Sequence, residues 1–229
     1  MSDSQAGARS AETTTPRRGR PGYDLESLLA VAVSVFNERG YDGTSMEDLS
    51  RRLGISKSSI YHHVQSKEEL LALALDRALD GLFSVVEQVT SSVADQVSGG
   101  AEKQGPAPAI ERLEKLVRGS VSVLADRLPY VTLLLRARGN TPSDRKALAR
   151  RRQFDQIVAD LVKEAERDGD IRPDVDPAVT ARLLFGMVNS LVEWYRPAGR
   201  GAATGTEALA DAVCAVAFDG LRTRRQSPA

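Results

Sequence analysis

The sequence is poor in the residues on which redox, metal and membrane proteins depend. Only one of its 229 residues is a cysteine, and only two are histidines, which adjoin each other. A lone cysteine excludes an intrachain disulfide, and neighbouring positions of a helix point about 100° apart, which places the two histidines poorly for sharing a metal ion. No apolar run approaches the roughly 20 residues of a membrane-spanning helix, and none follows Met1 as in a signal peptide. We therefore expect a cytoplasmic protein without membrane contact, metal or cofactor.

The chain also lacks an excess of charge of either sign. The chain holds 31 Lys and Arg against 31 Asp and Glu, and residues 1–80 hold ten of these cations against twelve of the acids. Between Arg51 and Lys67, however, four cations occur without an acid. Any attraction for an anionic partner is therefore expected to be local rather than spread over a basic domain.

A helix-turn-helix is predicted within residues 40–70. Thr44 and Glu47 can form a capping box, because the hydroxyl can accept from the Glu47 N–H while the carboxylate reaches back to the Thr44 N–H. One apolar face follows at helical spacing, made of Met46, Leu49 and Leu53. Gly54 suits the left-handed residue that ends a helix, and Ser56 can cap the next one.

The second helix of this pair is predicted to bury Ile60 and Val64. Its outward face then consists of small, polar and aromatic residues, namely Ser58, Ser59, Tyr61 and His62. A second capping box, Ser66 with Glu69, predicts that a longer helix begins directly afterwards.

This arrangement resembles the DNA-binding domain of the TetR family of bacterial regulators. The resemblance rests on Gly40, Thr44, Met46, Leu49, Leu53, Gly54, Ser56, Ser59, Ile60, Tyr61, His63, Val64, Lys67 and Leu70. It implies that Thr44, Tyr61 and Lys67 hold phosphates of double-stranded DNA, and that Lys57, Ser58 and His62 reach base edges. The full set of expected contacts from the domain is Thr44, Ser56, Lys57, Ser58, Ser59, Tyr61, His62 and Lys67. For each of them the alternative is a solvated helix face.

Residues 1–22 are expected to form a disordered basic arm, because they show no apolar periodicity. Within it, Arg17, Arg18, Gly19, Arg20 and Pro21 resemble the core of a minor-groove AT-hook. Arg18 and Arg20 are accordingly expected to contact a narrow A·T minor groove. A solubilising tail is the alternative.

The rest of the chain reads as all-α. Asp24 is expected to cap a first helix that completes a three-helix DNA-binding domain at 23–70. The helix after Ser66 is predicted to run for roughly 30 residues, and a loop follows at 98–108. Further helices are predicted at 109–126, 129–138, 142–168, 177–196 and 206–223. Asp176 caps the fourth of these, with Pro177 in its first position.

The C-terminal helical domain, 71–224, is expected to bind a ligand and to dimerise, with a short tail at 225–229. Its last two helices carry more apolar residues than one face needs, namely Leu184, Met187, Val188, Leu191, Leu209, Val213, Val216 and Ala217. The resemblance implies that these helices pair with their copies in a homodimer; the alternative is an intrachain core. Cys214, in the same segment, is expected to be a buried small hydrophobe rather than a redox sensor.

An effector pocket is implied by the same resemblance. The residues expected to bind the effector are Tyr130, Leu134, Arg136, Arg151, Phe154, Phe185, Asn189 and Trp194, with Leu133 beside them. A cluster of cations, Arg136, Arg138, Arg145, Lys146, Arg150, Arg151 and Arg152, is offset locally only by Asp144. Arginines around an apolar cavity suit a ligand with an acyl part and a phosphorylated handle; a solvated surface is the alternative.

Two segments, YVTLLLRARGN and LLFGMVNSLVEWYRP, are similar to the branch of the TetR family that senses acyl-CoA thioesters. The sequence therefore predicts a repressor that binds a palindromic operator as a homodimer and is released by an acyl-CoA such as phenylacetyl-CoA. An activator, or a helical interaction module without ligand-induced release, is the alternative. An enzyme is not expected, because the lone Ser143-x-x-Lys146 has no companion motif and both histidines lie on the predicted recognition helix.

Overall fold

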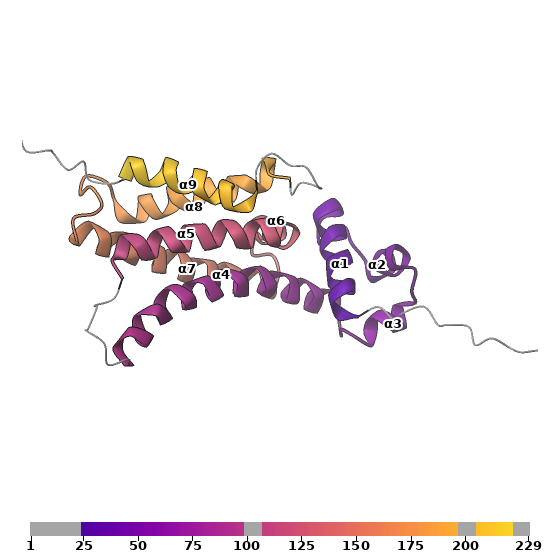
Figure 1. Ribbon diagram of the computed structural model, residues 1–229. Helices are drawn as coiled ribbons and strands as arrows, with labels where there is room; N and C mark the ends of the chain where they lie inside the picture. Colours follow the sequence, from indigo (N-terminus) through magenta and orange to yellow (C-terminus); the bar gives the residue numbers. More distant parts are fainter. Residues whose placement is uncertain (1–23, 99–106, 197–204, 222–229) are drawn as a thin grey trace, which may run out of the picture.

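The computed structural model describes residues 24–98, 107–196 and 205–221. Within these ranges all regular elements are helices, which confirms the predicted all-α fold. They are α1 Leu25–Arg39, α2 Met46–Leu53, α3 Lys57–Tyr61, α4 Lys67–Ser98, α5 Ala109–Asp126, α6 Leu128–Arg136, α7 Pro142–Arg167, α8 Pro177–Trp194 and α9 Thr206–Leu221. Figure 1 shows α1, α2 and α3 gathered at one end of the molecule, beside a larger bundle of the remaining helices.

The start of α2 differs by one residue from the prediction. Ser45 is the cap: its hydroxyl accepts from the Asp48 N–H at 3.2 Å, and the Asp48 carboxylate accepts from the Ser45 N–H at 3.0 Å. The predicted pair of Thr44 with Glu47 is therefore wrong. The Thr44 hydroxyl instead donates to the carbonyl of Gly40 at 2.7 Å, and the residue is buried.

The turn between α2 and α3 forms as predicted. Gly54 lies in the left-handed region with φ 66°, where glycine carries no steric penalty. Ser56 caps α3 by accepting from the Ser59 N–H at 3.2 Å, and Ile60 and Val64 are buried. α3 is thereby held at a defined angle to α2, with its opposite face free.

α4 begins directly after Ser66, whose hydroxyl accepts from the Glu69 N–H at 3.1 Å. The second half of the predicted capping box is different, because the Glu69 carboxylate accepts from the Gln65 N–H at 2.5 Å and not from Ser66. The helix continues for 32 residues. One helix thus belongs to both parts of the molecule (Figure 1).

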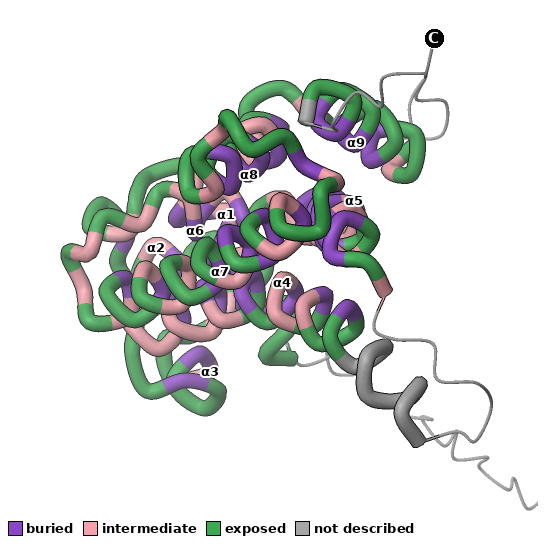
Figure 2. Tube along the Cα trace, turned by 90° about the vertical axis from the view of Figure 1, so that its left-hand side faces the viewer, coloured by how far each residue is buried: buried purple, intermediate pink, exposed green. Residues whose placement is uncertain are grey.

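α5 lies at the centre of the larger bundle and contacts α4, α7, α8 and α9. Figure 2 shows the buried residues where the helices meet and exposed residues on their outer sides. The predicted start of α8 is confirmed, since Asp176 accepts from the Val179 N–H at 2.8 Å and Pro177 stands in the first turn, but the helix ends at Trp194 instead of residue 196. Two glycines allow the backbones of α4 and α5 to lie close together. A Cβ at Gly81 would lie 2.8 Å from a methyl carbon of Val123, and a Cβ at Gly119 would overlap the side chain of Val85.

We expect Gly119→Ala to lower the free energy of unfolding by about 1 kcal/mol, because overpacking costs more than the helix gains from alanine. Urea denaturation followed by circular dichroism measures this. In the double variant with Val85→Ala, the loss should be smaller than the sum of the two single losses. Simple additivity would contradict the close approach of α4 and α5.

Candidate functional site

The outward face of α3 is polar and accessible. Ser58 and His62 are exposed, and Tyr61 is 50% exposed, whereas Ile60 on the opposite side is fully buried. The Ser56 hydroxyl lies 2.8 Å from that of Ser58 and 2.9 Å from that of Ser59. The first turn of α3 therefore presents a compact group of hydroxyls next to an exposed phenol.

The cations around this face already have carboxylate partners. Arg51 pairs with Asp48 at 3.3 Å, Arg52 pairs with Glu38 at 3.0 Å, and Lys57 pairs with Glu47 at 3.4 Å. The stretch that lacks acids in sequence is thus partly neutralised in space, which corrects the expectation of an uncompensated positive patch. Exposed pairs of this kind contribute only about 0–1 kcal/mol, so a DNA phosphate can replace the carboxylate at little cost.

Lys67 occupies a different position from the one expected of a phosphate ligand. Its ammonium donates to the carbonyls of Tyr41 and Thr44, both at 2.8 Å, and lies 4.1 Å from the centre of the Tyr41 ring. The first turn of α4 is thereby fixed to the loop between α1 and α2. Thr44 is buried as well, so Lys67 and Thr44 both stabilise the helix-turn-helix through contacts within the protein. The contact of Tyr41 with Lys67 was not predicted from the sequence. The available signal was an aromatic residue shortly before the cap of α2.

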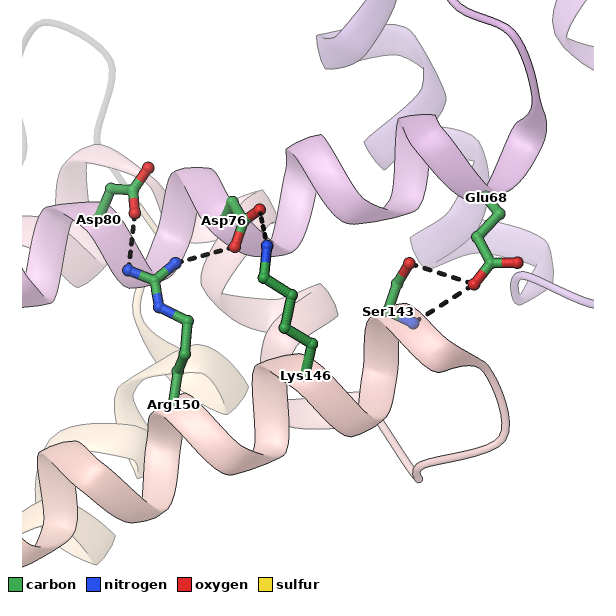
Figure 3. Close-up of polar contacts among 6 residues, drawn as sticks. All are labelled: Glu68, Asp76, Asp80, Ser143, Lys146 and Arg150. Carbon is green, nitrogen blue, oxygen red and sulfur yellow. Dashed lines mark hydrogen bonds and ion pairs between the residues drawn. The ribbon is translucent and has the colours of Figure 1, made fainter.

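Two cations of the cluster, Lys146 and Arg150, face α4 from α7. Lys146 pairs with Asp76 at 2.9 Å, and Arg150 pairs with Asp76 and Asp80, both at 2.8 Å. Figure 3 shows these side chains reaching across from α7, together with Ser143, whose N–H and hydroxyl donate to Glu68 at 3.3 and 3.2 Å. We call Glu68, Asp76 and Asp80 the carboxylate row of α4.

These contacts give Lys146 and Arg150 partners within the chain, whereas Arg136 and Arg138 line a small cavity of about 170 Å³ beside Leu133. The Arg150 guanidinium also lies 5.1 Å from the centre of the Phe83 ring. Arg136 donates to the carbonyl of Asn37 at 2.8 Å, and Arg145 donates to the carbonyls of Gly139 and Asn140. Within the cluster the only acid in sequence is Asp144, whereas the acids that pair with Lys146 and Arg150 lie about 70 positions away.

The expected effector residues range from buried to exposed, with Arg151 and Asn189 half-buried. Phe154 and Phe185 pack edge to face with ring centres 4.9 Å apart, and both are buried, as is Leu134. Tyr130 is half-buried beside Arg77 of α4, and burial raises the pKa of its phenol. Trp194 is 59% exposed, so within one chain it does not line an interior cavity.

An open groove of about 500 Å³ runs between α8 and α9. Val179, Leu183 and Val216 stand along it with 49%, 68% and 69% of their surface exposed. Most of the residues expected at a dimer face are instead buried within the chain, namely Leu184, Val188, Leu191, Leu209, Val213 and Ala217. Of the expected set, only Val216 is exposed and Met187 half-buried. The exposed apolar residues of α8 and α9 therefore overlap with the expected set only at Val216 and, in part, at Met187.

Metal and membrane sites are not found in the described residues. These contain no group of three His, Cys, Asp or Glu side chains arranged around a metal position. They also contain no helix that is both long and apolar enough to cross a membrane. Cys214 is buried, and burial raises the pKa of its thiol. Arg18 and Arg20 lie outside the described residues.

The arrangement of α1 to α3 and of the larger bundle agrees with known protein families. The model of the tetR family of bacterial regulatory proteins matches residues 28–74, and that of the tetracyclin repressor-like C-terminal domain matches residues 106–221. The chain belongs to the TetR family. It is therefore a DNA-binding regulator with a helix-turn-helix, α2 and α3, and the family is one of transcriptional regulators rather than enzymes.

Three relatives show how far the similarity of this TetR protein extends. SCO3833 of Streptomyces coelicolor A3 is 53% identical, with a TM-score of 0.72 over 87% of this chain and 92% of its own. The transcriptional repressor KstR2 of Mycolicibacterium smegmatis is 25% identical over 79% of this chain and 83% of its own. AibR, solved in complex with isovaleryl coenzyme A and operator DNA, is 26% identical, with a TM-score of 0.63 over 84% of this chain and 97% of its own.

We expect Lys67→Met to lower the free energy of unfolding by about 2 kcal/mol, because it removes two hydrogen bonds donated by a charged group. Urea denaturation provides the measurement. Lys57→Met is the control, since its exposed ion pair is expected to contribute less than about 0.5 kcal/mol. A Lys67→Met protein that unfolds like the wild type but no longer binds DNA would restore Lys67 as a direct phosphate ligand.

Proposed function

We propose that this chain is a homodimeric repressor that binds a palindromic operator through α3 and is released by an acyl-CoA. The observation that carries the DNA-binding part is the exposed polar face of α3, placed by the buried Ile60 and Val64. The acyl-CoA part is supported by AibR, whose structure was solved with isovaleryl coenzyme A and operator DNA, and repression is supported by KstR2. Phenylacetyl-CoA and isovaleryl-CoA are the first effectors to test.

On DNA, the roles we propose follow from exposure. Tyr61 donates to a phosphate, and Lys57, Ser58 and His62 face base edges, because these are the exposed groups on α3. Lys57 must leave Glu47 to reach a guanine. A gel shift with the upstream region of its own gene tests operator binding, and an unretarded fragment would favour the alternative, a helical interaction module.

We expect Glu47→Gln to strengthen operator binding about two- to fivefold, the equivalent of one exposed ion pair that no longer competes. Fluorescence anisotropy with a labelled operator measures the change at fixed salt. Glu111→Gln, an exposed substitution on α5, should leave the affinity unaltered. Weaker binding by Glu47→Gln would instead mean that Glu47 positions Lys57 productively.

The dimer we propose uses the exposed apolar face of α8 and α9. Val179, Leu183 and Val216 would be covered by the same face of a second copy, as a two-fold interface requires. Two copies in this arrangement would present two α3 helices to successive half-sites of a palindrome.

Leu183→Glu is expected to give a monomer in analytical ultracentrifugation, because it places a carboxylate in the middle of the proposed interface. Ala149→Glu, at an exposed position of α7, is the matched control and should remain dimeric. A dimeric Leu183→Glu protein would place the interface elsewhere.

Release by the effector is proposed to pass along α4. The carboxylate row joins α4 to α7, and Lys67 joins α4 to the helix-turn-helix. An effector that moves α7 therefore displaces α3 within the dimer. A hundredfold loss of operator affinity needs a difference of only about 2.7 kcal/mol in effector binding between the two arrangements.

Arg150→Gln should keep operator affinity within about twofold of the wild type, since the site lies far from α3, while the effector concentration needed for half-release rises at least about tenfold. Anisotropy titrations with each acyl-CoA provide both quantities. Arg152→Gln, an exposed neighbour, controls for the loss of one charge. Thermal shift against an acyl-CoA panel tests the effector class, and no stabilisation by any member would end that part of the proposal.

A further inference from the structure

A second open groove, of about 460 Å³, lies between α1 and α4. Its floor is apolar and consists of Leu25, Leu29 and Leu73. Leu25 is 39% exposed, which is unusual for a leucine in the first turn of a helix that otherwise buries its apolar side. The groove is separate from the outward face of α3 and from the groove between α8 and α9.

The rim of this α1–α4 groove is acidic. Asp24, the cap of α1, and Glu26 contribute from one side, Asp76 and Asp80 contribute from α4, and Arg77 is the one cation among the lining residues. The lining residues thus carry a net charge of −3. Glu26 pairs with Arg77, and Asp76 and Asp80 pair with α7, yet the side chains of Glu26 and Asp80 remain 54% and 63% exposed.

The exposed carboxylates can therefore take a further donor. An ionised carboxylate accepts at about four lone-pair positions, and Arg150 uses one oxygen of Asp80. Figure 3 shows Arg150 approaching Asp76 and Asp80 from the side of α7. A ligand that fits this groove must present cations to the rim and an apolar stem to Leu25.

We propose that the α1–α4 groove binds the arginine strip of the same chain, residues 17–21. The strip ends three residues before Asp24, so an extended connection of about 10–25 Å is available to it. Its three arginines, Arg17, Arg18 and Arg20, bring +3 to a rim that stays negative, at −1, when Lys146 and Arg150 are counted with the four carboxylates and Arg77. Guanidinium groups bind carboxylates in a bidentate manner, while their aliphatic stems cover apolar surface.

The consequence is a competition between two sites for one segment. The arginines that enter a minor groove in the arm hypothesis are the same ones that would occupy the α1–α4 groove, so they cannot do both. Binding of the strip within the protein lowers its contribution to operator affinity, and operator DNA withdraws it. Because Asp76 and Asp80 also hold α7, the position of α7 would alter how strongly the strip is held.

Limited trypsin digestion of the full chain without DNA tests this inference, with mass spectrometry locating the cuts after Arg17 and Arg18. The double variant Glu26→Gln/Asp80→Asn should be cut at least about threefold faster than the wild type, because exposed ion pairs protect only modestly. Asp160→Asn, whose side chain is 61% exposed on α7, is the matched control and should be cut at the wild-type rate.

Arg150→Gln separates binding of the strip from a general loosening of α4. It frees Asp80 without removing a groove carboxylate, so the strip should be protected at least as well as in the wild type. Faster cutting in this variant, or equal cutting of the wild type and the double variant, would overturn the proposal. Protection that rises with protein concentration would place the strip on a second copy and would also overturn it.

A second measurement uses the operator. The double variant should bind operator DNA about threefold more tightly than the wild type when the arm is present, and equally well when Arg17, Arg18 and Arg20 are replaced by alanine. A gain that persists without these arginines would contradict the competition. The digestion needs no operator, so it remains decisive if the proposed repressor function is wrong.

Discussion

The anchoring of Lys67 is the interaction on which the rest of the structure depends. A single ammonium group holds two carbonyls of the loop between α1 and α2 and lies against the ring of Tyr41. It does so from the first residue of a helix that continues for 32 residues into the larger bundle. The small DNA-binding part is therefore joined to the first turn of α4, so we expect a motion of this turn to displace α3.

The contact between α4 and α7 combines ion pairs with an apolar contact, because the rings of Phe83 and Phe154 pack edge to face with their centres 6.2 Å apart. The carboxylate row of α4 meets Ser143, Lys146 and Arg150 of α7 along one side of the helix (Figure 3). Ion pairs of this exposure are weak and exchangeable, whereas the α4–α5 contact at Gly81 and Gly119 is close-packed. α4 thus contacts α5 through close-packed glycines and contacts α7 through ion pairs and one aromatic pair, so we expect a shift of α7 to act on α4.

Much of this fold was predictable from sequence, because helix periodicity and capping are local. The observed bounds of α5 are the predicted ones, and Asp24, Gly54 and Asp176 act where their chemistry indicated. The start of α2 shows the limit of predicting a helix cap from local sequence. Thr44 with Glu47 and Ser45 with Asp48 are two overlapping capping boxes, and only the burial of Thr44 against Gly40 decides between them. The choice between the two capping boxes depends on a tertiary contact, so the local sequence pattern does not determine it.

The candidate sites were less predictable, for the same reason. The cations of α7 have partners about 70 positions away on α4, and the expected effector residues Phe154 and Trp194 turned out to be a core residue and a surface residue. The exposure of Trp194 has a practical consequence, because it is the only tryptophan in the chain. Its emission spectrum reports the environment of the end of α8 alone, so the protein carries an intrinsic optical sensor there, separate from the helices that face DNA.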